Sequence, residues 1–197
     1  MKPTRFLTVA LILIGLVAIA NAAGTPAGTE ITNQAQGSYN DANGNEVAGS
    51  TEGYLFSNEV STFVSQVAGA DLGNDQGQNI SALGTVLYQV LFTNTGNGDD
   101  SFGLAVAENS APTGDFTYEI YSDGGTLGVL DGSDAIITST GSLSADGTYN
   151  LIVKVTDVTV GGAGEGDVAP ITLTATSVHN GSVTADVVLT TTVQAAT

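Results

Sequence analysis

Residues 84–98 read GTVLYQVLFTNTGNG, and this stretch joins a run of strand formers to a turn. Valine, tyrosine, phenylalanine and threonine dominate its first half, and these residue types favour a pleated, half-buried strand. The stretch continues as Asn94-Thr95-Gly96-Asn97-Gly98-Asp99-Asp100, a cluster of residues that favour turns. It therefore predicts a strand over Thr85–Asn94 that ends in a tight turn.

The same alternation of strand formers and turn formers extends outward in both directions. Hydrophobic residues recur with a period of two, and no apolar run at helical spacing follows residue 22. Turns are expected at Asp41–Asn45 and, as a tight hairpin, at His179-Asn180-Gly181. The other expected strands are Glu30–Tyr39, Glu52–Val67, Phe102–Glu108, Phe116–Tyr121, Ala135–Thr140, Thr148–Val158, Ile171–His179 and Ser182–Gln194. Evenly spaced strands without helices predict an all-β, antiparallel β-sandwich.

The first 22 residues have the layout of a secretory signal peptide. Lys2 and Arg5 precede an apolar run from Phe6 to Ala20, and Ala20-Asn21-Ala22 supplies the small residues of a cleavage site. The alternative is a retained membrane anchor, since the run is only slightly shorter than a spanning helix. We expect cleavage before Ala23, no membrane insertion of the mature chain, and an extracellular or cell-surface location.

The sequence indicates a weak boundary in the mature chain near residues 67–71. Residues 68–197 predict a complete sandwich of about seven strands, and residues 23–67 predict an N-terminal strand segment. The sequence leaves open whether this segment folds on the sandwich, on itself or on another molecule.

Charge and cysteine content exclude several classes of function. The chain has 20 acidic residues and three basic ones, and cleavage would leave Lys154 as the only Lys or Arg, a net charge of 1 − 20 = −19. Such a surface has almost nothing to neutralise phosphate, so we expect no nucleic-acid partner. With no cysteine, the exported domain would be stable without disulfides.

Several segments resemble one known family. Residues 84–98 are similar to the YTITVTNTGNG signature of the DUF11-type repeat, an immunoglobulin-like domain of prokaryotic cell-surface proteins. The other similar segments are Ala27–Ala35, Ile120–Asp134, Ile136–Gly141, Tyr149–Val155 and Ile171–Ser177. The resemblance implies an immunoglobulin-like β-sandwich and carries no activity with it. The family's domains occur as tandem repeats in long, anchored proteins, whereas this chain holds one copy. We therefore expect it to act as a free protein, bound to a partner, or as part of a non-covalent assembly.

Catalysis has little support among these residues. The only histidine, His179, lies in a turn, and no cysteine is present to act as a nucleophile. Two facing carboxylates would suffice for a glycosidase, but most acidic residues here lie in turns, where they favour turn formation. We expect a protein that is not an enzyme, and a secreted hydrolase is a less favoured alternative.

The acidic, glycine-rich segment 122–134 is a candidate calcium site. Calcium binds six to eight oxygen ligands, and glycine lets a loop close around it. By resemblance to the family's loop, Asp123, Asp131 and Asp134 would be ligands, although Gly-Gly-Thr-Leu replaces other expected ligands. The alternative is a solvated acidic loop, and Asp99-Asp100 is a weaker candidate of the same kind.

Three further residues suggest modification. Lys154 could form an isopeptide bond, or be an ordinary surface lysine on an acidic sheet. Asn79 and Asn180 begin Asn-x-Ser sequences and are candidate glycosylation sites.

The segment that follows Ala23 suggests self-assembly. Between Glu30 and Tyr39, one phase of the expected strand holds Ile31, Asn33, Ala35, Gly37 and Tyr39, and the other phase is wholly polar. One face is thus fit for burial, as in an edge strand, and could add to a sheet edge of the same chain or of a neighbour. We expect a secreted structural subunit of a filament built by strand donation, with further copies as its partners. A monomeric binding module for glycan or surface adhesion is the alternative.

Overall fold

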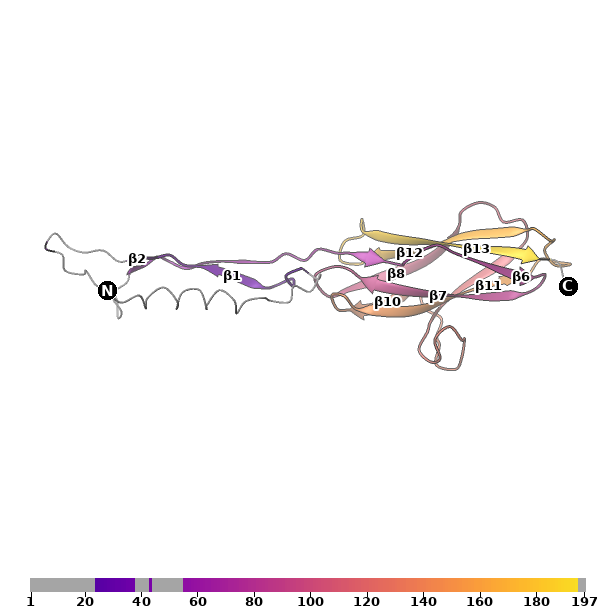
Figure 1. Ribbon diagram of the computed structural model, residues 1–197, viewed down its shortest axis with the longest axis horizontal. Coiled ribbons are helices and arrows are strands. Elements are labelled where there is room, and N and C mark those ends of the chain that lie inside the picture. The colour runs from indigo at the N-terminus through magenta and orange to yellow at the C-terminus, as the bar shows by residue number, and fades with distance from the viewer. Residues whose placement is uncertain (1–23, 38–42, 44–54, 195–197) are drawn as a thin grey trace, which may run out of the picture.

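The computed structural model describes residues 24–37, 43 and 55–194. The expected signal peptide, Tyr39 and the turn expected at Asp41–Asn45, apart from Asn43, lie outside this range. Within it the chain is all-β, as expected, and forms an immunoglobulin-like sandwich with an N-terminal strand extension (Figure 1). No helix in the described residues is long and apolar enough to cross a membrane.

Two sheets make the sandwich. The five-stranded sheet has the order β10 (Ser139–Leu143), β8 (Asp100–Glu108), β12 (Val168–Ser177), β13 (Thr184–Gln194) and β6 (Gln76–Ser81). The four-stranded sheet has the order β5 (Ala70–Asp71), β7 (Thr85–Asn94), β11 (Thr148–Asp157) and β9 (Phe116–Ser122). Neighbouring strands are antiparallel except β6, which runs parallel to β13.

Alternate residues of both sheets meet in one core. On β7 the inward phase holds Val86, Tyr88, Val90 and Phe92, all buried, because successive side chains of a strand point to opposite faces. The rings of Phe92 and Phe102 pack across the sandwich with centroids 4.5 Å apart. The Tyr88 hydroxyl contributes a buried hydrogen bond to the Thr191 hydroxyl of the opposite sheet, at 2.9 Å. These contacts hold the sandwich together without disulfides.

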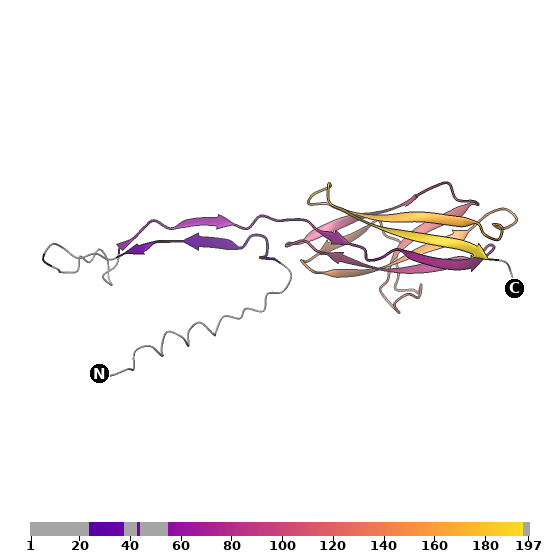
Figure 2. The ribbon, with the colours of Figure 1, turned by 45° about the horizontal axis from the view of Figure 1, so that its top comes forward.

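The N-terminal segment lies outside both sheets. It forms a narrow antiparallel ribbon in which β1 (Glu30–Asn33) pairs with β4 (Val60–Phe63) and β2 (Gln36–Gly37) pairs with β3 (Leu55–Phe56). The ribbon extends away from one end of the sandwich (Figures 1 and 2). We call residues 24–37 and 55–67 the arm.

The observed strands differ from the expected ones in several places. In the arm, the expected strand Glu30–Tyr39 is interrupted at residues 34–35, and the expected strand Glu52–Val67 is interrupted at residues 57–59 and ends at Phe63. Residues 135–140 do not form one strand, because Ile136 makes only an isolated bridge to β9 and β10 then begins at Ser139 on the other sheet. The hairpin at His179–Gly181 is wider than expected, since β12 ends at Ser177 and β13 begins at Thr184. Strands β5 and β6 were not predicted, because Gln76–Ser81 reads QGQNIS, with Ile80 its only large apolar residue.

Candidate assembly surface

The arm carries large apolar side chains that its own sandwich does not cover. Ile31 is 52% exposed, Val60 61% and Phe63 63%. The pairing register sets Ile31 opposite Thr62 and Asn33 opposite Val60, so these four residues share one face of the ribbon. Phe63 lies opposite Glu30 on the other face of this ribbon, and Phe56, which is also half exposed, lies opposite Gln36. The arm therefore offers apolar contacts to a second molecule.

The residues predicted for assembly lie on this arm. Ile31, Asn33, Ala35 and Gly37 are all exposed, and Tyr39 is outside the described residues. The sequence left open how residues 23–67 fold, and the structure pairs the described parts with each other. The partner strand β4 was not recognised as part of the same surface, although the run from Val60 to Phe63 carried the signal.

One asparagine of the turn between β7 and β8 joins the arm to the sandwich. The Asn97 side chain accepts a hydrogen bond from the Val67 amide at 2.7 Å and donates to the carbonyls of Thr25 and Ser65, both at 3.1 Å. Its backbone N–H donates to Val67 O, and its carbonyl accepts from the Ala27 amide. Both arm strands are thus bonded to one residue, which sets the direction in which the arm leaves the sandwich.

A second asparagine of the same turn is buried and holds the turn itself. Asn94 is fully buried, and its amide group donates to the carbonyls of Gly98, Leu143 and Ser144 at 3.0 Å. Gly96 permits close contact with the arm, because a Cβ there would lie 2.6 Å from the Val67 carbonyl oxygen. The sequence predicted this turn but did not reveal that it positions the arm.

The acidic loop after β9 uses its carboxylates to bind its own backbone. Asp131 accepts from the amides of Thr126 and Ser133, and these bonds lower the pKa of its carboxyl. Asp134 accepts from Gly124 and Asp131, and Asp123 Oδ2 accepts from Gly128 at 2.8 Å. Asp123 Oδ1 is buried without a hydrogen-bond partner among the described residues.

The described residues give no recognisable group of metal ligands in this loop. In the part of the chain that the structure describes, no three acidic or histidine side chains are grouped as metal ligands. Asp123, Asp131 and Asp134 accept hydrogen bonds from amides of the loop, and their expected role as calcium ligands stays a prediction.

The other acidic candidate, Asp100, is a structural residue. It is buried, and its carboxylate accepts from the Ser177 hydroxyl at 2.5 Å and from the amides of Ser101 and His179. Burial raises the pKa of Asp100, but these hydrogen bonds outweigh burial and lower it overall. The carboxylate ties β8 to the hairpin between β12 and β13, where the side chain of His179 is exposed.

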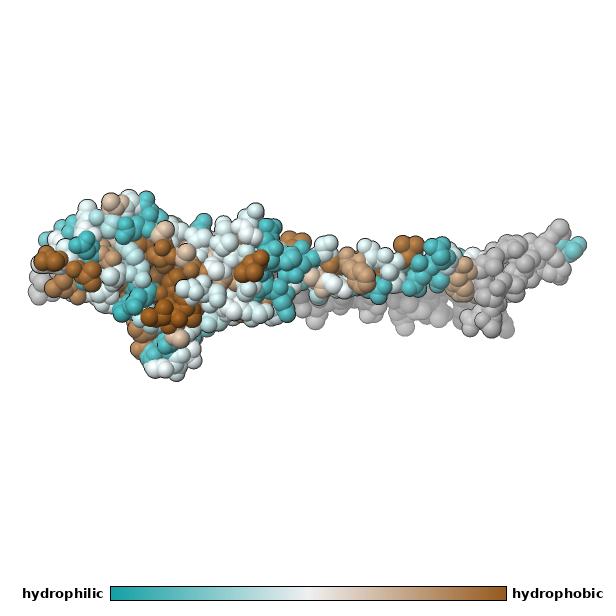
Figure 3. Space-filling model, turned by 180° about the vertical axis from the view of Figure 1, so that it is seen from behind, coloured by the Kyte–Doolittle hydropathy of each residue, from teal (hydrophilic) through white to brown (hydrophobic). Residues whose placement is uncertain are grey.

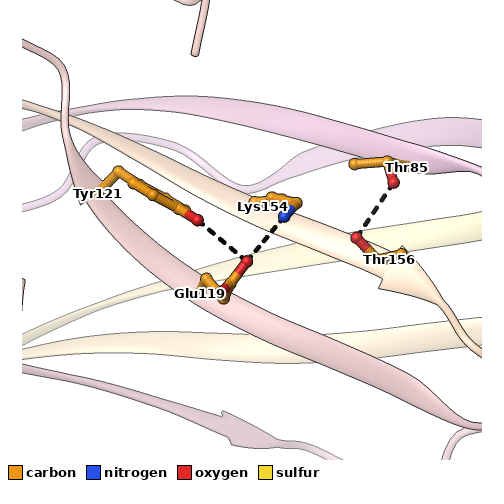
Figure 4. A network of polar contacts seen from close by, with 5 residues as sticks. All are labelled: Thr85, Glu119, Tyr121, Lys154 and Thr156. Carbon is orange, nitrogen blue, oxygen red and sulfur yellow. Dashed lines mark hydrogen bonds and ion pairs between the residues drawn. The ribbon is translucent and has the colours of Figure 1, made fainter. Parts of the chain in front are cut away.

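Lys154 lies on the outer face of the four-stranded sheet. Its ammonium donates to Glu119 Oε2 at 2.8 Å, and the Tyr121 hydroxyl donates to the same oxygen (Figure 4). The partner of Lys154 is thus a glutamate on the neighbouring strand β9. The polar contacts in Figure 4 include no aspartate or asparagine with which Lys154 could form an isopeptide bond. Such a partly exposed ion pair adds little stability.

The two candidate glycosylation sites are both exposed. Asn79 lies on β6, and Asn180 lies in the turn between β12 and β13, where its side chain accepts from the Ser182 amide.

Comparisons with known proteins leave the family undecided. No protein-family model and no curated protein sequence matches the chain. Three similar solved structures are a PapD-like domain of human CEP192, the secreted serine protease VesC from Vibrio cholerae, and a family 123 glycoside hydrolase from Clostridium perfringens. Their sequence identities are 11%, 15% and 8%, and their TM-scores are 0.38, 0.39 and 0.40.

These similarities are too low to assign a family or a function to this chain. They cover 66%, 64% and 66% of it. The aligned region spans 87% of the CEP192 domain but only 23% of the protease and 28% of the glycoside hydrolase. The resemblance to the DUF11-type repeat therefore stays a prediction, and function rests on the arm.

Proposed function

We propose that this protein is a secreted structural subunit that assembles with copies of itself into an extracellular or cell-surface filament. The arm of one subunit would be donated to the sandwich of the next. A DUF11-type domain of a prokaryotic cell surface would suit this role. The observation that carries the proposal is the ribbon formed by β1 and β4, whose apolar side chains are more than half exposed.

Physical reasons favour a partner for this ribbon. An isolated two-stranded ribbon is at best marginally stable in water, and it gains stability when its apolar face is covered. The outer edge of each arm strand also has unpaired backbone groups in the described residues, which can extend another sheet. Contact between an arm and a different surface of the next copy is head-to-tail, and repeated contacts of this kind give a filament unless they close into a ring.

Charge should regulate this assembly. A mature subunit with a net charge of −19 repels its copies, and Glu30 and Glu59 place part of that charge on the arm. Salt weakens such repulsion, because the Debye length falls from about 30 Å at 0.01 M to about 8 Å at 0.15 M ionic strength.

Sedimentation velocity of the mature chain, residues 23–197, tests the proposal. We expect monomers at low concentration, large assemblies at high concentration, and a shift of assembly to lower concentrations as salt rises. Electron micrographs of the same samples should show filaments. A chain that stays monomeric at high concentration in both salt conditions would refute the proposal and leave a monomeric binding module as the better account.

A further inference from the structure

Next to the acidic loop, the chain crosses from one sheet to the other. The Ile137 amide donates to the Ile120 carbonyl of β9 at 2.9 Å, and the next residue, Thr138, accepts from the Leu104 amide of β8 at 2.8 Å. Strand β10 then continues along β8 from Gly103 to Asp100. The crossing segment therefore covers only part of the edge of β8 and part of the edge of β9.

The remaining parts of both edges have no strand partner in the described chain. On β8, the Asn109 amide donates to Pro170 of β12, whereas the Leu104 amide points to the other edge of the strand. Backbone groups alternate between the two edges along a strand, so those of Val106 and Glu108 point in the same direction as the Leu104 amide, away from β12. On β9, the Ser122 amide and the Ile120 carbonyl bond to the crossing segment, so the backbone groups of Phe116 and Tyr118 point to the same open side.

An apolar groove lies between these two free edges. It has a volume of about 440 Å³, and its walls include Leu104 and Val106 from β8 and Tyr118 and Ile120 from β9. Val106 and Tyr118 pack against the core while remaining partly exposed. Ile136, which is 63% exposed, also lines the groove. Apolar surface gathers where the acidic loop projects from the sandwich (Figure 3). Val106 and Tyr118 thus leave part of their apolar surface exposed along this side, whereas Leu104 and Ile120 beneath them are buried.

The groove is bordered by polar groups at its rim. The Tyr118 hydroxyl donates to Glu108 Oε1 at 3.2 Å, which links β9 to β8. Burial and the Glu108 carboxylate raise the pKa of Tyr118 to about 12, so the hydroxyl stays protonated at neutral pH. Glu108 places a negative charge at the rim, whereas the charge of Glu119 is paired with that of Lys154.

The opposite side of the sandwich is closed in a different way. There, the side chains of Gln76 and Gln78 on β6 reach across and donate to the carbonyls of Gln89 and Leu87 on β7, at 2.8 and 3.2 Å. These bonds occupy the edge of β7 that β11 leaves free. A strand added to the sandwich would find open backbone groups in the groove between β8 and β9.

We infer that the groove between β8 and β9 receives the arm of a second copy of this chain, an inference that rests on the proposed function. Strands β1 and β4 have four residues each, and the free edges of β8 and β9 are about as long. Ile31 or Val60 supplies an apolar side chain that can pack on the exposed parts of Val106 and Tyr118, and the arm backbone pairs with the free edges.

The arm of the same molecule does not reach this groove. Asn97 fixes the arm at the turn that precedes β8, whereas the groove lies along the far half of that strand. The arm leaves the sandwich in the direction away from it (Figures 1 and 2). The contact is therefore between molecules and head-to-tail.

Crosslinking through introduced cysteines tests this inference, because the chain has none of its own. The mature Ile31→Cys protein is mixed with mature Val106→Cys protein under assembling conditions and treated with a short bis-maleimide. We expect covalent dimers joined between residues 31 and 106. Ala105→Cys, at an exposed position beside the groove, serves as a second reporter if Val106→Cys folds poorly.

The matched control is Val178→Cys, in the turn between β12 and β13. Val178 is 70% exposed, so random collision would favour it over the half-buried Val106. Because binding raises the effective concentration of the paired groups, we expect at least about tenfold more dimer with Val106→Cys than with Val178→Cys.

Filaments with equal yields for both positions would overturn the groove assignment and leave the proposed function intact. Absence of any assembly would overturn both.

Discussion

The mature chain carrying Ile31→Asp and Val60→Asp should remain a folded monomer and lose the ability to assemble. Both side chains are more than half exposed on the free arm, so the free energy of unfolding should change little. In an assembled contact the same positions would bury unpaired carboxylates and lose apolar burial. We expect the concentration needed for assembly to rise at least about 100-fold, which corresponds to about 2.8 kcal/mol.

A matched variant separates this effect from added charge. Val178→Asp with Asn180→Asp adds the same two negative charges in the turn between β12 and β13, which belongs to the sandwich and not to the arm. Sedimentation velocity should show assembly of this control at nearly the wild-type concentration. Equal loss of assembly in both variants would mean that charge repulsion, and not the arm, controls association.

Asp157→Asn should destabilise the sandwich by roughly 2 to 3 kcal/mol at pH 7. Asp157 is 2% exposed at the end of β11, and its carboxylate accepts from the amides of Leu83, Thr159 and Ala163 at 2.7 to 3.0 Å. Burial raises the pKa of this group, but the hydrogen bonds outweigh it and lower the pKa to about 2. Asparagine would turn an N–H donor toward amides that already donate.

The pH dependence of this effect has a definite sign. Because the folded pKa lies below the unfolded value of about 3.9, the stabilisation is present above about pH 5 and is lost as the pH falls toward 2. Urea unfolding at pH 7 and pH 3 should therefore show a smaller difference between wild type and Asp157→Asn at the lower pH. Asp146→Asn, in the exposed turn before β11, is the control and should differ little from wild type at either pH. A difference for Asp157→Asn that does not change with pH would contradict the low pKa.

The sandwich strands could be predicted where side chains alternate strongly. Thr85–Asn94 is observed as β7 with the predicted bounds, and Phe116–Tyr121 differs from β9 by one residue. Strand β6 could not be predicted, since its pairing with β13 depends on backbone bonds and on glutamines that reach the opposite sheet. Propensity carries no information about such distant partners.

The arm was only partly predictable for the same reason. The phase of Ile31 showed one face fit for burial, but the pairing of β1 with β4 joins residues about 30 positions apart. Asn97 read as an ordinary turn residue, and its bonds to Thr25, Ser65 and Val67 appear only in three dimensions. The groove between β8 and β9 likewise depends on where the crossing segment leaves one sheet for the other.

The most direct test of strand donation is a cryo-electron microscopy structure of the assembled mature protein. The account predicts a filament in which β1 and β4 of each subunit lie against the sandwich of the next, with Ile31 and Val60 covered by that neighbour. A filament whose subunits contact one another only through their sandwiches, with β1 and β4 still exposed to solvent, would contradict it.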